Sequence, residues 1–397
     1  MRIPDNVLVQ LNKLQRVALI VGVVATLISI GGYFADPSRF FRAYLYSYMF
    51  WLGLTGGCLA MLMLHHIVGG GWGFIIRRLL EAGSKLLPLA FVLFLPLLGG
   101  LSYLYPWMHE PEDRIMAWRQ VWSNWPMYVT RIVICFVIWG IFAYFLNKWS
   151  KLQDESNDSG IYEKLTKWSS FGFLVYCVTM SFAVIDLTMS TNSHWYSSMY
   201  PAVFLAGQGL STLTFMLVTL AFLTKGGWPI NEVPTKFFRD LGNLVLAATL
   251  FWAYVSFSEF LIIYSANISE SATFYVFRRQ GPFWWLIVAI MALHFFLPFF
   301  VLLTGDNIKR SIPRLAKIAL FILVMRWVNL YWIIMPAWPE VRVAPFQWID
   351  FVLPFALGGW WLAAFAAMVK RTESMLPVHD PRLEGNWPPL QEVAQHG

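Results

Sequence analysis

Charged residues are scarce in this sequence. Only 13% of its 397 residues are Asp, Glu, Lys or Arg, whereas 58% are hydrophobic. A soluble chain carries roughly a quarter charged residues, so this chain lacks the polar groups that would cover a surface in water. The 21 Trp and 16 Tyr suit a membrane protein, because both side chains favour the headgroup level of a bilayer. The composition therefore predicts an all-α integral membrane protein, with lipid around it.

Sequence patterns for metal and haem binding are also missing. The cysteines are isolated and lie in apolar runs: Cys58, Cys135 and Cys177. Without a CxxC, CxxCH or Cys/His cluster, covalent haem, iron–sulfur and structural zinc sites are not expected. A haem b needs two His from different helices at matched depth, but His294 lies near the middle of a span and His65 and His66 at an inner edge. We expect no cofactor to be bound directly by this chain.

The net charge of +7 does not indicate nucleic-acid binding. The basic residues lie at the ends of apolar segments and form no single patch. The N-terminal segment is short and basic, and no small-residue cleavage signal follows its apolar run. It is therefore interpreted as a retained first span and not as a removable signal peptide.

Long apolar runs recur along the whole chain. A membrane-crossing helix needs about 20 apolar residues. Ten segments qualify: 17–34, 43–68, 86–105, 129–147, 169–188, 199–223, 241–264, 283–304, 315–335 and 348–369. Most of the 29 Lys and Arg fall in the terminal segments and in alternate loops on the same side. By the positive-inside rule, both termini are expected in the cytoplasm.

A faint internal repeat links the second and sixth spans. Gly70-Gly71-Trp72 follows the second span, and Gly226-Gly227-Trp228 follows the sixth. Upstream, Tyr46-Ser47 matches Tyr196-Ser197 and Gly57 matches Gly207, both at an offset of 150 residues. Each unit would hold four spans, so both would insert in the same direction. The pattern predicts two four-helix bundles related by an axis along the membrane normal, plus two flanking helices.

The repeat also predicts how the chain divides. The predicted parts are an N-terminal segment with the first flanking helix (1–38), the first bundle (39–190), the second bundle (191–340), the last flanking helix (341–370) and a cytoplasmic tail (371–397). The tail is rich in Pro and polar residues, so it is expected to be ordered only where a partner holds it.

Ionisable side chains inside the spans are the candidates for function, because charge at bilayer depth is costly. A proton path is one hypothesis, since buried carboxylic acids and His exchange protons near neutral pH. Its candidates are Glu259, Asp186 and Asp350 on the outer side, His294 and Arg326 near the middle, His65, His66 and Asp306 on the inner side, and the hydroxyls of Tyr254, Ser256 and Ser258.

Structural roles are the alternative for the same residues. Arg326 would then neutralise Glu259 or Asp350 within a bundle, and Asp186 and Asp350 would reach headgroup water. A quinone site beside Asp186, Glu259 or His294 is a further hypothesis. The alternative is that these side chains only pack within the helix bundle.

Two stretches carry a family resemblance. Residues 40–83 read FFRAYLYSYMFWLGLTGGCLAMLMLHHIVGGGWGFIIRRLLEAG, and residues 377–385 read PVHDPRLEG. The chain resembles, over most of its length, the ActF subunits of bacterial alternative complex III, which are similar to the NrfD and polysulfide-reductase membrane anchors. The most specific part is the Gly-Gly-x-Trp-Gly-x-x-x-Arg-Arg stretch that starts at Gly69.

The resemblance implies a subunit of a quinol:electron-acceptor oxidoreductase in the bacterial cytoplasmic membrane. It implies partners that carry the redox groups: a multihaem cytochrome c, an iron–sulfur protein and a second NrfD-like subunit that is the main site of quinol oxidation. This subunit would support the complex, conduct protons and contact membrane lipids. No residue motif transfers a quinone site to this sequence.

Two other functions stay open from the sequence. One is a quinol-binding anchor of a different iron–sulfur or molybdenum-type reductase. The other is a secondary transporter, which the parallel repeat permits. Transporters break helices at mid-membrane, whereas the Gly-Gly-Trp elements here lie at predicted helix ends, which disfavours that reading.

Overall fold

The structure is a computed structural model that describes residues 3–109, 121–156, 158–192, 195–228, 235–372, 374, 376 and 377, apart from the side chain of Ser159. Most of the predicted tail, 371–397, lies outside these residues. The described parts of the chain are helical and contain no β-strand, which confirms the all-α prediction.

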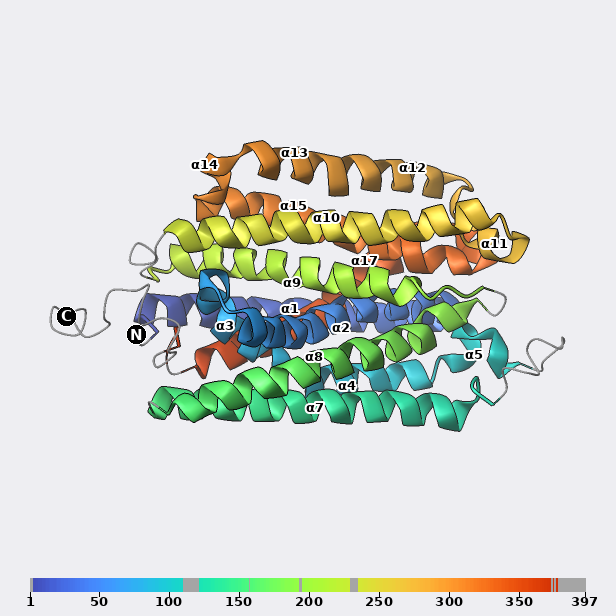
Figure 1. Ribbon diagram of the computed structural model, residues 1–397. Coiled ribbons are helices and arrows are strands. Elements are labelled where there is room, and N and C mark those ends of the chain that lie inside the picture. Colours follow the sequence, from blue (N-terminus) through green and yellow to red (C-terminus); the bar gives the residue numbers. More distant parts are fainter. Residues whose placement is uncertain are drawn as a thin grey trace.

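Figure 1 shows the helices coloured by their order along the chain. They are α1 (Asp5–Ala35), α2 (Pro37–Val68), α3 (Gly71–Ser84), α4 (Leu87–Leu98), α5 (Leu101–Leu104), α7 (Trp125–Glu155), α8 (Ser159–Leu187), α9 (Tyr200–Lys225), α10 (Thr235–Ala266), α11 (Ser269–Arg278), α12 (Pro282–Ala289), the π-helix η4 (Ile290–Phe296), α13 (Leu297–Thr304), α14 (Asp306–Lys309), α15 (Ile312–Ile334), α16 (Pro339–Val343) and α17 (Trp348–Lys370). Short 3₁₀ turns are η1 (Pro106–Met108), η2 (Met189–Thr191) and η5 (Met335–Ala337).

Local sequence explains several helix starts. The Asp36 side chain accepts a hydrogen bond from the Arg39 amide at 2.9 Å, and Pro37 occupies the first turn of α2. The Asn124 side chain caps α7 in the same way, at 3.0 Å from the Met127 amide. A capping side chain followed by proline is the expected N-terminal signature of a helix.

The helices are long and apolar enough to cross a membrane. In the described part of the chain nine single helices meet this test, and the pair α3 and α4, bent by 43° at a short break, makes ten. All ten predicted spans fall on these helices. Residues 71–84, which precede the third predicted span, also form a helix, α3.

The long helices lie side by side (Figure 1), and their contacts can be described as two groups with a flanking pair. In the first group α2 contacts α4, α7 and α8, and in the second α9 contacts α10 and α15, while the α12–α13 segment packs on α10 and α15. Contacts of α2 with α9 join the groups. This packing agrees with the expected pair of four-helix groups. The predicted symmetry axis and domain boundaries stay predictions.

The flanking helices α1 and α17 run antiparallel along each other. Lys370, at the end of α17, donates to Asn12 Oδ1 of α1 at 2.8 Å. Midway along the pair, a Cβ on Gly22 would lie only 3.0 Å from the Trp360 amide nitrogen, so glycine lets the two backbones approach closely. The start of α1 and the end of α17 therefore lie at the same end of the molecule.

Candidate functional site

Two of the predicted outer carboxylates are held by arginines from other helices. Arg39 of α2 donates to Asp350 Oδ1 from Nε at 2.9 Å and also reaches Oδ2, which accepts from Tyr331 at 2.9 Å. Asp350 is only 1% exposed. These bonds tie α2 to the start of α17. The expectation that Asp350 reaches headgroup water is therefore wrong.

Asp186 is bound in a similar way between α7 and α8. Arg131 donates to both carboxylate oxygens, at 2.7 and 2.9 Å, and Trp122 Nε1 donates at 3.2 Å. Bidentate arginine–carboxylate pairs are among the strongest side-chain contacts. Asp186 is buried, so its expected contact with headgroup water is also wrong.

Arg326 lies near the middle of α15 and is 2% exposed. Its Nη1 donates to Asn329 Oδ1, one turn along the same helix. Within the described residues no carboxylate lies at ion-pair distance, so Arg326 pairs with neither Glu259 nor Asp350. A Cβ on Gly207 of α9 would overlap the guanidinium, so this glycine provides the space that Arg326 occupies.

His294 lies in the π-helix η4 and is fully buried. Its ring contacts the Trp252 ring of α10, with 4.3 Å between centroids. Neither ring nitrogen has a hydrogen-bond partner in the described part of the chain. The π-helix η4 packs against α15, the helix that carries Arg326. Short π-helical segments occur frequently at functional sites, so His294 stays a strong candidate.

Glu259 lies on α10 and is 4% exposed. Its Oε1 has no hydrogen-bond partner among the described groups, and the side chains that act on the carboxylate are Ser197 and Arg278. Trp252 lies seven residues earlier, which is two helical turns or about 10 Å along the same face. Glu259 and the His294–Trp252 contact therefore share one face of α10.

Tyr200 was not among the predicted candidates. It begins α9, is buried, and lies within electrostatic range of both Glu259 and Arg326. We call Glu259, Tyr200, Arg326 and His294 the second-bundle cluster. Each of these side chains can form hydrogen bonds to water or to a transferred proton carrier.

Arg278 of α11 closes the outer end of this cluster. It donates to the Phe274 carbonyl at 2.8 Å, to the Trp332 carbonyl at 3.1 Å and to the Ile333 carbonyl. The last two belong to the final turn of α15, where a cation complements free carbonyls. Burial lowers the pKa of Arg278 to about 10, so it stays charged at neutral pH beside Glu259.

The inner candidates differ from one another in burial. His65 and His66 are both buried, at the end of α2. The His65 ring packs edge-on against Trp72, with 5.5 Å between centroids. A Cβ on Gly73 would overlap that ring, so the glycine-rich start of α3 fits around His65.

Asp306 is not an interior group. Its side chain is 44% exposed and pairs with Arg239 at 3.1 Å and Arg310 at 2.7 Å. It is therefore not a buried member of the predicted path, because surface ion pairs of this kind exchange freely with water.

The hydroxyls proposed on α10 do not extend the cluster as predicted. Tyr254 is 68% exposed on the outer face of the helix, so it points away from Glu259. The Ser256 hydroxyl donates to the Trp252 carbonyl at 2.8 Å, and Ser258 is half-buried. Tyr254 is excluded from a path along the buried face.

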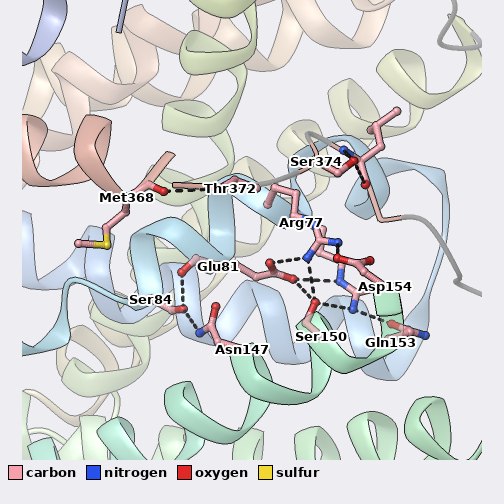
Figure 2. Close-up of polar contacts among 12 residues, drawn as sticks. Arg77, Glu81, Ser84, Asn147, Ser150, Gln153, Asp154, Met368, Thr372 and Ser374 are labelled. Carbon is pink, nitrogen blue, oxygen red and sulfur yellow. Dashed lines mark hydrogen bonds and ion pairs between the residues drawn. The ribbon is translucent and has the colours of Figure 1, made fainter. Parts of the chain in front are cut away.

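The sequence analysis missed a buried network between α3 and α7 (Figure 2). Arg77 and Arg78 were not among the predicted site residues, yet both are buried. Glu81, one turn later, accepts from Arg77 Nε at 3.2 Å and from Arg78 Nη1 at 2.8 Å. The Ser150 hydroxyl of α7 donates to Glu81 Oε1 at 2.6 Å.

Further bonds complete this α3–α7 network (Figure 2). Arg77 Nη2 donates to Gln153 Oε1 at 2.8 Å, and Arg78 pairs with Asp154. The Asn147 amide donates to the Ser84 hydroxyl at 3.0 Å. Within the described residues, two guanidinium groups thus face two carboxylates. The signal that marks it in the sequence is the spacing of Glu81, three and four residues after the arginines.

Among the residues that the structure describes, no three His, Cys, Asp or Glu side chains gather in a way that could hold a metal ion. No protein-family model matches the sequence, and a search of curated proteins finds no match.

Proposed function

We propose that this chain is a membrane subunit of a bacterial quinol:electron-acceptor oxidoreductase complex, which it supports and through which it passes protons. In this proposal the redox groups belong to its partners, a multihaem cytochrome c, an iron–sulfur protein and a second NrfD-like subunit. Both termini face the cytoplasm. The resemblance of residues 40–83 and 377–385 supports the assignment to a complex of this kind.

Proton transfer is supported most directly by Glu259. A buried carboxyl with an unpartnered oxygen gains and loses a proton more readily than one fixed in a bidentate ion pair. Asp186 and Asp350 are fixed in that way, whereas Glu259 is not. Tyr200 lies within electrostatic range of Glu259 and Arg326, and water can complete a hydrogen-bonded chain between these groups.

The test is the substitution Glu259→Gln in the intact complex, reconstituted into liposomes. Glutamine keeps the size of the side chain but cannot carry a proton. Quinol oxidation should continue, while the rate of proton transfer through this subunit falls by about 100-fold, the lower range for loss of an acid–base group.

Asp306→Asn is the matched control, because Asp306 is a carboxylate in a surface ion pair. It should leave proton transfer at the rate of the unsubstituted complex. Proton transfer that proceeds equally well in the Glu259→Gln complex would show that the path does not use this carboxyl.

A secondary transporter is a second candidate, favoured by the interrupted helices. The α3–α4 pair is bent by 43°, and η4 interrupts the α12–α13 segment. Transporters use such breaks at their binding sites. A transporter should purify without haem-containing partners and should accumulate a substrate in liposomes on its own. Purification with those partners favours the complex.

A further inference from the structure

Hydrogen-bond donors outnumber acceptors around His294. The Trp252 indole N–H can only donate, and it has no partner in the described chain. A neutral imidazole carries one N–H, and both nitrogens of His294 are unpartnered. The guanidinium of Arg326 has five N–H groups, and the described residues offer it one acceptor, Asn329 Oδ1. A ligand that binds beside His294 and Arg326 must therefore accept several hydrogen bonds at once.

The charge at this place is also unbalanced. Arg326 is buried near mid-span, where an uncompensated charge is costly. Each of the other buried arginines considered above faces a carboxylate or helix-end carbonyls: Arg39 faces Asp350, and Arg278 faces the end of α15. Glu259 lies beside Arg278 and forms no ion pair with Arg326 among the described residues. The Arg326 region therefore carries a net positive charge.

We propose that Arg326 and His294 bind a small monovalent inorganic anion, such as chloride, inside the second bundle. An anion neutralises the guanidinium and accepts hydrogen bonds from it and from the imidazole N–H. The absence of a side chain at Gly207 gives the guanidinium its space beside α9. This inference rests on the donors and the charge alone, and it holds whether or not the chain transfers protons.

The test uses the full chain purified in detergent with its natural partners, exchanged into gluconate buffer of constant ionic strength. Binding of radioactive chloride is measured by equilibrium dialysis, and the unfolding midpoint is measured with increasing chloride. One saturable chloride per chain should bind. The midpoint should rise with chloride concentration, because a ligand that binds only the folded state stabilises it.

Arg326→Gln should remove both the bound chloride and the chloride-dependent rise. Arg239→Gln, which changes an arginine in a surface ion pair, should leave both unchanged. A chain that binds no saturable chloride, or an Arg326→Gln chain that binds it as well as the unsubstituted one, overturns the proposal. Should Arg326→Gln fail to fold, Gly207→Ala provides the second test: it must weaken chloride binding at least tenfold, since it displaces the guanidinium, and unchanged binding overturns the proposal.

Discussion

Replacing Glu81 by alanine is expected to lower the free energy of unfolding by roughly 3–5 kcal/mol, the usual effect of breaking a buried ion pair. The substitution removes the carboxylate that both Arg77 and Arg78 contact. Arg78 would keep Asp154, whereas Arg77 would lose its contact with Glu81 and keep its hydrogen bonds to Ser150 and Gln153. The two buried guanidinium groups between α3 and α7 would then have lost the carboxylate that they share.

Unfolding in mixed detergent, followed by circular dichroism, measures this change. Glu163→Ala is the control, because Glu163 forms a pair of the same spacing with Lys167 on an exposed surface, where both side chains are more than half exposed. That substitution should cost no more than about 0.5 kcal/mol. Equal effects of the two substitutions would mean that the α3–α7 network does not hold the bent α3–α4 segment in place.

Gly207→Ala is expected to destabilise the protein by about 1–3 kcal/mol, the typical cost of overpacking a filled interior. The added Cβ would overlap the guanidinium of Arg326, which is buried and cannot swing into solvent. Either α9 separates from α15 or Arg326 leaves its position. Both outcomes disturb the second-bundle cluster, so proton transfer should fall along with stability.

Gly140→Ala is the matched control within α7, because nothing lies within 4 Å of the added Cβ. Alanine is a better helix former than glycine, so this substitution should stabilise the protein by about 0.5–1 kcal/mol. The unfolding free energies of the two variants, measured side by side, should change in opposite directions. Stabilisation by both would show that α9 has room beside Arg326.

The membrane spans could be predicted from sequence because each depends on a local property, the length of an apolar run. The helix α3 could not be predicted in this way. Its Arg77, Arg78 and Glu81 look like loop residues, and the partners that neutralise them lie on α7, about 70 residues later in the chain. A charged segment becomes an interior helix only through such distant contacts.

The same reason explains the errors over the outer carboxylates. Asp350 and Asp186 were expected to meet water because each lies at a span end. Arg39 and Arg131 decide their surroundings instead, and these arginines lie 311 and 55 residues away in sequence. A carboxylate near a span end is buried when an arginine pairs with it. The position of the carboxylate along its own helix does not show whether such a partner exists.

The internal repeat stays a prediction, and one of its matched pairs is not equivalent in the structure. Tyr46 is buried within α2, whereas Tyr196 precedes α9 and is exposed.

The most direct test of the central proposal is to solubilise the membrane gently, isolate this chain and record both its subunit list and its haem absorbance spectrum. We predict that it copurifies with a c-type cytochrome and an iron–sulfur protein, and that the preparation shows haem absorbance that changes on reduction. A chain that purifies alone under these conditions, without haem absorbance, would contradict its assignment to a quinol oxidoreductase complex.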